Sequence, residues 1–197
     1  MPNQLKAGAI LTYVTLFLNS AIGLIYTPFL TLKLGQAEYG LYSLVASVVG
    51  SLTVLDFGFG NALIRYTAKL RAEKKEQKLK EMYGMFFIIF CGIALLALII
   101  GMVVYFNTEN IFSQNMTGEE LGKMKIMLLL MVFNLCFTFV MSVYRSIIVA
   151  YERFIFQKVI NLIRILLNPL VMVIFLLFGY KAITMVVLQT IFNVLTL

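Results

Sequence analysis

The chain has 197 residues, of which 61% are hydrophobic and 13% charged, with a net charge of +7 and a mean hydropathy of +0.96. A soluble domain is nearer half apolar with about 25% charged residues, so folding in water would expose too much apolar surface. The sequence contains no histidine, which excludes Ser-His triads and histidine metal sites. We therefore predict an all-α integral membrane protein, with no cofactor and no nucleic-acid partner.

Apolar stretches long enough to cross a bilayer, which takes roughly 20 residues, follow one another along the chain. We predict six transmembrane helices, over residues 5–32, 39–60, 82–106, 125–151, 159–179 and 182–197. The first stretch is too long for the core of a cleavable signal peptide. The last has only 16 residues and no charge after it, so we expect the chain to be the N-terminal part of a longer protein.

Positive charge is concentrated between the second and third predicted helices, where residues 65–80 hold two arginines and five lysines. Such segments stay on the cytoplasmic side, which places the N-terminus in the cytoplasm. With Arg145 and Arg164 assigned to the membrane, ten Lys and Arg residues then lie inside and four outside. We interpret residues 65–80 as a loop that sets topology, and anionic membrane lipids are its expected partner.

Polar residues recur at steps of three and four in four of the predicted helices, so each set lies on one helix face. The sets are Thr12, Thr15, Asn19, Gly23 and Tyr26; Asn134, Thr138, Ser142 and Arg145; Gln157, Asn161, Arg164 and Asn168; and Gln189, Asn193 and Thr196. Lipid penalises such groups, so the faces point toward protein or water. They either join packed helices by hydrogen bonds or line a shared hydrated cavity.

Arginines within the membrane are the sharpest candidates for binding. Arg164 is about five residues into its helix, or roughly 8 Å deep at 1.5 Å per residue, and Arg145 lies at a similar depth. Each side chain either snorkels to the headgroups or faces a cavity, and no acidic residue shares its stripe. We therefore predict an anionic ligand. The candidate substrate-binding residues are Arg164, Arg145, Asn161, Asn168, Asn134 and Asn19.

Two further residues are candidates for gating or ion coupling. Asp56 ends the second predicted helix, where it either carries a proton or cation or is an ordinary interfacial residue. Pro28 lies inside the first helix and is expected to kink it. Cys91 and Cys136 each lie in an apolar run, which is typical of small buried hydrophobes and not of a metal site.

Three segments carry a family resemblance. Residues 28–42 combine a proline, an apolar stretch, Leu-Gly and then Tyr-Gly-Leu-Tyr, and residues 55–65 contain an Asp-x-Gly segment followed by a small residue and an arginine. A shorter link, Tyr-Glu-Arg-Phe, occupies residues 151–154. Together these resemble bacterial polysaccharide (O-antigen-type) flippases of the multidrug/oligosaccharidyl-lipid/polysaccharide exporter superfamily, across the whole chain.

The resemblance implies a fold of two six-helix lobes around a central cavity, of which residues 1–197 would form the N-terminal lobe and the C-terminal lobe is absent. It implies a transporter in the bacterial cytoplasmic membrane that flips a polyprenyl diphosphate-linked oligosaccharide by alternating access. The polysaccharide assembly machinery is a further implied partner. Alternatives are a multidrug or peptidoglycan-precursor exporter of the same superfamily, or a non-transporting membrane partner. An enzyme is not expected, because clustered intramembrane carboxylates are missing.

Overall fold

The computed structural model describes residues 2–112, 116–151 and 154–197, and every element in these ranges is helical. The elements are α1 Pro2–Leu34, α2 Gln36–Leu52, the short 3-10 helix η1 Thr53–Asp56, α3 Phe59–Ala72, α4 Glu76–Phe112, α5 Gly118–Ala150, α6 Phe154–Leu177 and α7 Ala182–Thr196. The predicted all-α class is confirmed.

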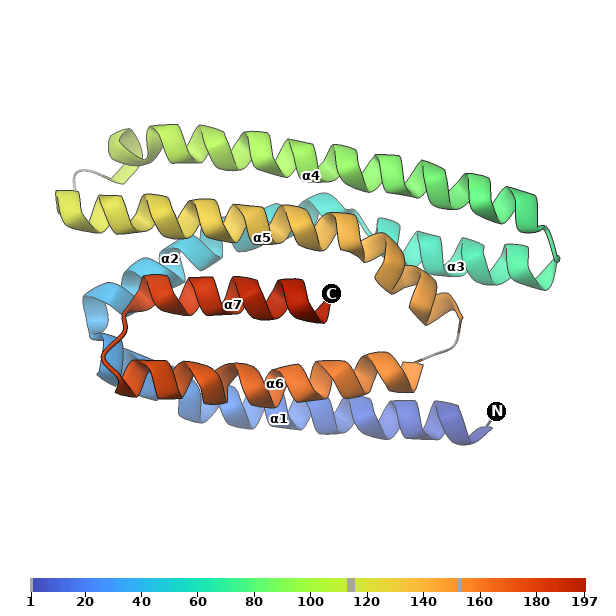
Figure 1. The fold of residues 1–197 in the computed structure, drawn as a ribbon, viewed down its shortest axis with the longest axis horizontal. Coiled ribbons are helices and arrows are strands. Elements are labelled where there is room, and N and C mark those ends of the chain that lie inside the picture. Colours follow the sequence, from blue (N-terminus) through green and yellow to red (C-terminus); the bar gives the residue numbers. More distant parts are fainter. Residues whose placement is uncertain (1, 113–115, 152–153) are drawn as a thin grey trace.

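The helices run side by side along one long axis (Figure 1). The central helix is α5, which packs against α2, α3, α4 and α7. On the opposite side of the molecule, α1 pairs with α6, and α7 lies between this pair and α5. The polar faces of α5, α6 and α7 are therefore brought together inside one bundle.

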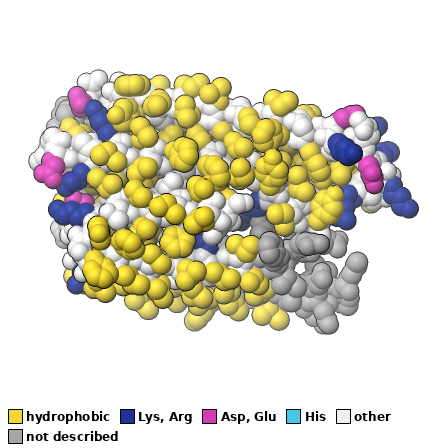
Figure 2. Space-filling model, viewed as in Figure 1, with side chains coloured by type: hydrophobic (Ala, Val, Ile, Leu, Met, Phe, Trp, Pro, Cys, Tyr) yellow, Lys and Arg dark blue, Asp and Glu magenta, His cyan; other side chains and the backbone are white. Residues whose placement is uncertain are grey.

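Within the described residues, five helical segments are long and apolar enough to cross a membrane: 10–34, 36–72, 76–112, 118–150 and 158–177. The remaining helix, α7, is also apolar but has 15 residues. Hydrophobic side chains form a broad band across the face shown in Figure 2, and charged side chains gather at its two ends. This distribution is that of a multi-pass membrane protein.

The predicted loop between the second and third spans is mostly helical. Residues 59–72 form α3 and residues 76–80 begin α4, so only the turn at 73–75 interrupts the helices. Lysine, arginine, glutamate and leucine are good helix formers. A helix rich in charged residues is not detected by a search for long apolar stretches, which is why the sequence pattern predicts a loop for this segment. The break in this span lies instead at Phe57 and Gly58, whose φ angles of 45° and 77° are left-handed.

Local sequence signals explain two other helix boundaries. Gly35 separates α1 from α2 with a φ of 80°, a conformation that glycine adopts without steric cost. Thr117 caps α5 in a reciprocal arrangement. Its backbone N–H donates to Glu120 Oε2 over 2.8 Å, and its hydroxyl accepts from the Glu120 N–H over 3.4 Å.

Two apolar cores hold the bundle together. The larger joins α2, α3, α4 and α5 to the start of α7, and its fully buried side chains include Leu63, Phe90 and Met124. A smaller core joins α1, α6 and α7 through Leu30, Met172, Leu176 and Met185. At the end of the bundle near the α1–α2 junction, Lys123 of α5 forms a 2.7 Å ion pair with Glu38 of α2. The core on the α1–α6 side is the smaller of the two.

The close contact between α4 and α5 gives a stability prediction. A Cβ atom at Gly101 would lie 2.6 Å from Val132 Cγ2, so Gly101→Ala forces a branched side chain to move. Overpacking of this kind typically costs 1–3 kcal/mol, and we expect a lower unfolding midpoint in detergent. Gly92→Ala on the same helix is the control, because nothing lies within 4 Å of its added Cβ. Val132→Ala should restore the stability of Gly101→Ala, and no rescue would contradict the clash.

Candidate functional site

A cavity of about 120 Å³ lies where α5 and α6 diverge beside α7. Its described lining is Arg145 and Ile148 from α5, Ile160, Asn161 and Arg164 from α6, and Thr196 and Leu197. Figure 2 shows positively charged side chains inside a recess of this otherwise hydrophobic face. The predicted residues Asn161 and Arg164 of α6 thus share one cavity with Arg145 of α5.

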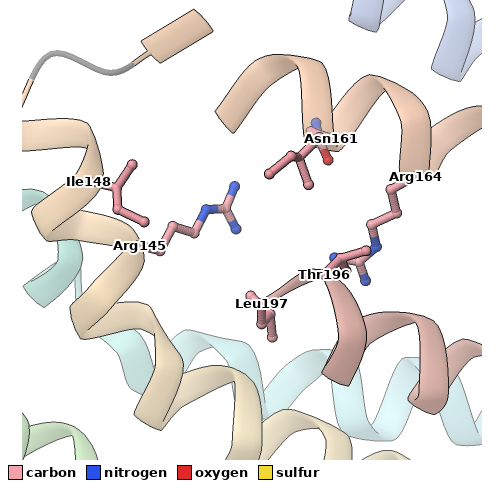
Figure 3. Close-up of a pocket in the computed structure, with 7 residues that line it drawn as sticks. Arg145, Ile148, Asn161, Arg164, Thr196 and Leu197 are labelled. Carbon is pink, nitrogen blue, oxygen red and sulfur yellow. The ribbon is translucent and has the colours of Figure 1, made fainter. Parts of the chain in front are cut away.

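The two arginines approach the cavity from different helices. Arg145 extends from α5 into the space between α5 and α6, and Arg164 extends from α6 toward Thr196 (Figure 3). Arg164 is half-buried and donates from Nη2 to Asn193 Oδ1 over 2.7 Å, whereas Arg145 is exposed. Among the described residues, no carboxylate forms an ion pair with either guanidinium. Two uncompensated positive charges therefore line a small space, which favours an anionic occupant.

Asn193 is the centre of a hydrogen-bond network that joins three helices. It is 4% exposed, accepts from Arg164 of α6, and donates from Nδ2 to both Asn134 Oδ1 and Thr138 Oγ1 (2.7 Å) of α5. Asn134 Nδ2 in turn lies 3.5 Å from Thr190 Oγ1. Buried polar groups need such partners in a membrane. The network fixes the side chain of Arg164 at the wall of the cavity.

The structure supports both interpretations of the polar stripes, each for different residues. Asn134, Thr138 and Asn193 join packed helices, as in the hydrogen-bonding interpretation. Asn161 and Thr196 line the cavity beside the arginines, as in the cavity interpretation. The polar faces of these helices therefore have two roles. Some of their residues form hydrogen bonds between helices, and others line the cavity.

The other predicted site residues lie outside the cavity lining. Asn168 is one turn beyond Arg164 on α6, and its buried Oδ1 has no hydrogen-bond partner among the described residues. Asn19 and Pro28 are exposed on α1. Asp56 is half-buried at the end of η1. The described structure brings none of these four side chains into contact with the arginine cavity.

A second recess of about 210 Å³ adjoins the network on the side of α2. Asn134 and Thr138 line it together with Tyr42 and Gln189, whose side chains are joined by a 3.2 Å hydrogen bond from the Tyr42 hydroxyl to Gln189 Oε1. Gln189 and Asn193 had a visible signal in sequence, the four-residue step along the last helix. The four-residue spacing predicts that both side chains lie on one face of α7. It does not predict which helices this face contacts.

Metal chemistry has no evident site in the part of the chain that the structure describes, since no three His, Cys, Asp or Glu side chains come together there. What the arrangement offers is recognition of charge. Two guanidiniums supply forked donors, and neighbouring amides and hydroxyls supply further hydrogen bonds.

Helices of this length and apolarity define a multi-pass membrane protein, and a cavity lined by two arginines lies between α5, α6 and α7. Comparison with known families identifies it further. The profile of the polysaccharide biosynthesis protein family matches residues 5–197, and the chain belongs to that family. Its members are transporter-like membrane proteins of polysaccharide biosynthesis. No curated protein and no solved structure gives a significant match.

Proposed function

We propose that this protein flips a lipid-linked oligosaccharide across the bacterial cytoplasmic membrane for cell-surface polysaccharide biosynthesis. The observation that carries the proposal is the cavity shared by Arg145 and Arg164, with no described carboxylate paired to either. The cargo is a polyprenyl diphosphate bearing a sugar chain. Family membership supports a role in the same pathway.

The cavity chemistry fits the charged part of this cargo. A diphosphate presents several anionic oxygens, and guanidinium groups bind such oxygens in pairs of parallel hydrogen bonds. Arg145 and Arg164 are assigned to this group, and Asn161 beside them to the adjoining oxygens. The polyprenyl tail stays in the bilayer, so the protein carries only the polar part of the cargo across.

Further residues belong to the same proposal in supporting roles. Asn134, Asn168 and Asn19 are assigned to the path of the sugar chain, and Asp56 and Pro28 to gating. Residues 1–197 form an N-terminal lobe, and a second lobe completes the cavity for alternating access. The positive lining argues against the export of cationic drugs. A peptidoglycan precursor carries the same diphosphate, so the direct test includes it as a second substrate.

The test is transport in proteoliposomes. Purified protein, with any sequence that follows residue 197, is reconstituted with a polyprenyl diphosphate oligosaccharide. Cargo that reaches the outer leaflet is measured by its cleavage with an impermeant glycosidase. We expect cleavage to extend to cargo that began in the inner leaflet, at a rate well above that of protein-free vesicles. Equal rates would contradict flipping, and faster transport of a peptidoglycan precursor would favour the alternative substrate.

The proposed orientation, with the N-terminus in the cytoplasm, gives a labelling prediction. Single cysteines are introduced as Lys78→Cys or Glu119→Cys, at exposed positions near opposite ends of the bundle, after Cys91→Ala and Cys136→Ala. An impermeant maleimide added to intact cells should label position 119 and spare position 78. Permeabilised cells, in which both positions react, are the control. Labelling of position 78 in intact cells would reverse the orientation.

A further inference from the structure

A further pocket, of about 570 Å³, lies at the turn between α3 and α4 and shares no lining residue with the cavity of Arg145 and Arg164, here called the transport cavity. Pockets of about 300–1,000 Å³ are of a size to hold small ligands. This one is lined by Leu70, Arg71, Lys74, Lys75, Glu76, Leu79, Lys80, Tyr83 and Tyr151. Figure 2 shows the charged side chains that gather at this end of the molecule. With the proposed orientation, this end faces the cytoplasmic leaflet.

Arg71 is held in place within this pocket. Its Nη1 donates to the Ala150 carbonyl oxygen over 3.0 Å, and its guanidinium carbon lies 4.0 Å from the centre of the Tyr151 ring. These two contacts, both to the end of α5, fix the plane of the guanidinium. Its other N–H groups remain as donors, because a guanidinium has five. The pocket therefore has one preorganised cationic wall.

Lys74 has an unusual backbone conformation in the same turn. Its N–H donates to Arg71 O and the Lys75 N–H donates to Leu70 O, each over 3.0 Å, which is the pattern that ends many helices. The residue at this position adopts a left-handed conformation, and Lys74 has a φ of 54°. Glycine suits that position best, so a lysine there is strained. A functional role would account for this strain, and the Lys74 side chain lines the pocket, where its ammonium adds a positive charge.

The pocket is strongly cationic. Arg71, Lys74, Lys75 and Lys80 line it against a single acid, Glu76. The charge of Lys75 is already matched by a 2.6 Å ion pair with Glu73. An arginine fork beside lysine ammoniums is chemistry that recognises a phosphate group.

We propose that this pocket binds the phosphate group of an anionic phospholipid from the cytoplasmic leaflet. The apolar side chains of Leu70 and Leu79 flank the cations, so glycerol and the first acyl carbons have apolar surface beside the phosphate. This site is separate from the transport cavity, and its occupancy does not depend on the cargo. It also differs from a diffuse attraction of residues 65–80 to the membrane, because only some of those lysines line the pocket.

That difference supplies a matched control. Lys74→Gln with Lys80→Gln removes two pocket charges, and Lys69→Gln with Lys78→Gln removes two from the same segment outside the pocket lining. Phosphatidylglycerol is titrated into each purified protein in detergent, with phosphatidylcholine as the neutral lipid. The unfolding midpoint reports binding, because a ligand of the folded state raises it. We expect at least a tenfold weaker apparent affinity for the pocket variant and less than a twofold change for the other.

Equal weakening in both variants would show a diffuse basic surface and overturn the pocket, as would no weakening in either. A parallel titration with glycerol 1-phosphate separates the possible sources of phosphate. If the soluble phosphate alone gives the full effect, the lipid assignment is wrong. If it gives little effect up to millimolar concentration, the membrane lipid is the ligand.

The variant Lys74→Gly tests whether weaker lipid binding could result from a damaged fold. Glycine relieves the left-handed strain, so the midpoint without lipid should be unchanged or higher than that of the original protein. The lipid-dependent rise should nevertheless shrink, because the ammonium is gone. A full lipid effect in this variant would contradict the role of Lys74. Since none of these measurements uses transport, they can fail while the proposed function stands, and the reverse also holds.

Discussion

Replacing both cavity arginines, as Arg145→Gln with Arg164→Gln, is expected to lower the rate of oligosaccharide flipping at least a hundredfold in proteoliposomes. The variant keeps polar side chains at both positions but removes the two charges that face a diphosphate. Hydrogen bonds to charged groups contribute about 1.5–3 kcal/mol each. Two such losses amount to about 3–6 kcal/mol. Because about 1.4 kcal/mol corresponds to a factor of ten, the smaller value already gives about a hundredfold effect.

Two comparisons separate binding from general damage. Lys69→Gln with Lys78→Gln removes the same charge from exposed positions outside the cavity and should leave flipping within about twofold of the original rate. Arg145→Lys with Arg164→Lys keeps the charge but loses the forked geometry, so an intermediate rate is expected. If the double glutamine variant is folded and flips at the original rate, the arginines do not hold the cargo.

The largest loss of stability is expected from Asn193→Ala. This side chain bonds to Arg164, Asn134 and Thr138, so its removal leaves polar groups of two other helices without partners. Hydrogen bonds between transmembrane helices average about 0.6 kcal/mol and reach about 1.7 kcal/mol. With a charged partner among the three, we expect a loss of about 2–3 kcal/mol. Unfolding in mixed detergent micelles measures it, with exposed Asn61→Ala as a near-neutral control.

Asn193→Asp distinguishes the structural role of this residue from its effect on the cavity. A carboxylate still accepts from Arg164, and it neutralises that charge, but it cannot donate to Asn134 and Thr138. Stability should therefore fall less than in Asn193→Ala, while flipping should fall more than stability alone explains. Normal flipping by the aspartate variant would show that the charge of Arg164 is not needed.

Sequence alone predicted the parts of the fold that follow from hydrophobic length. Apolar runs gave the class, and the last two helices begin or end within a few residues of their predicted bounds: α7 starts at Ala182, and α6 ends at Leu177. It missed α3, because its charged residues look like a loop on a hydropathy scale. The sequence prediction also placed Asp56 at the end of a span. In the structure the chain makes a left-handed break at Phe57 and Gly58, directly after Asp56, and then continues as α3.

The candidate site was predictable in part for a similar reason. Steps of three and four identify a polar face, and they make Arg145, Asn161 and Arg164 candidates without indicating the cavity that these residues share. This spacing does not predict which helix faces pack against one another. The central position of Asn193 arises because α7 lies between α5 and α6, an arrangement set by long-range packing. Asn19 shares the same kind of pattern but lies on an exposed face of α1.

The most direct measurement is the binding of a short polyprenyl diphosphate to the purified protein in detergent, by calorimetry. The original protein should bind the diphosphate, and Arg145→Gln with Arg164→Gln should weaken that binding at least thirtyfold. The corresponding neutral polyprenol should bind both proteins equally weakly, because it lacks the anionic group. Equal affinity of the two proteins for the diphosphate would contradict the assignment of this cavity to the cargo.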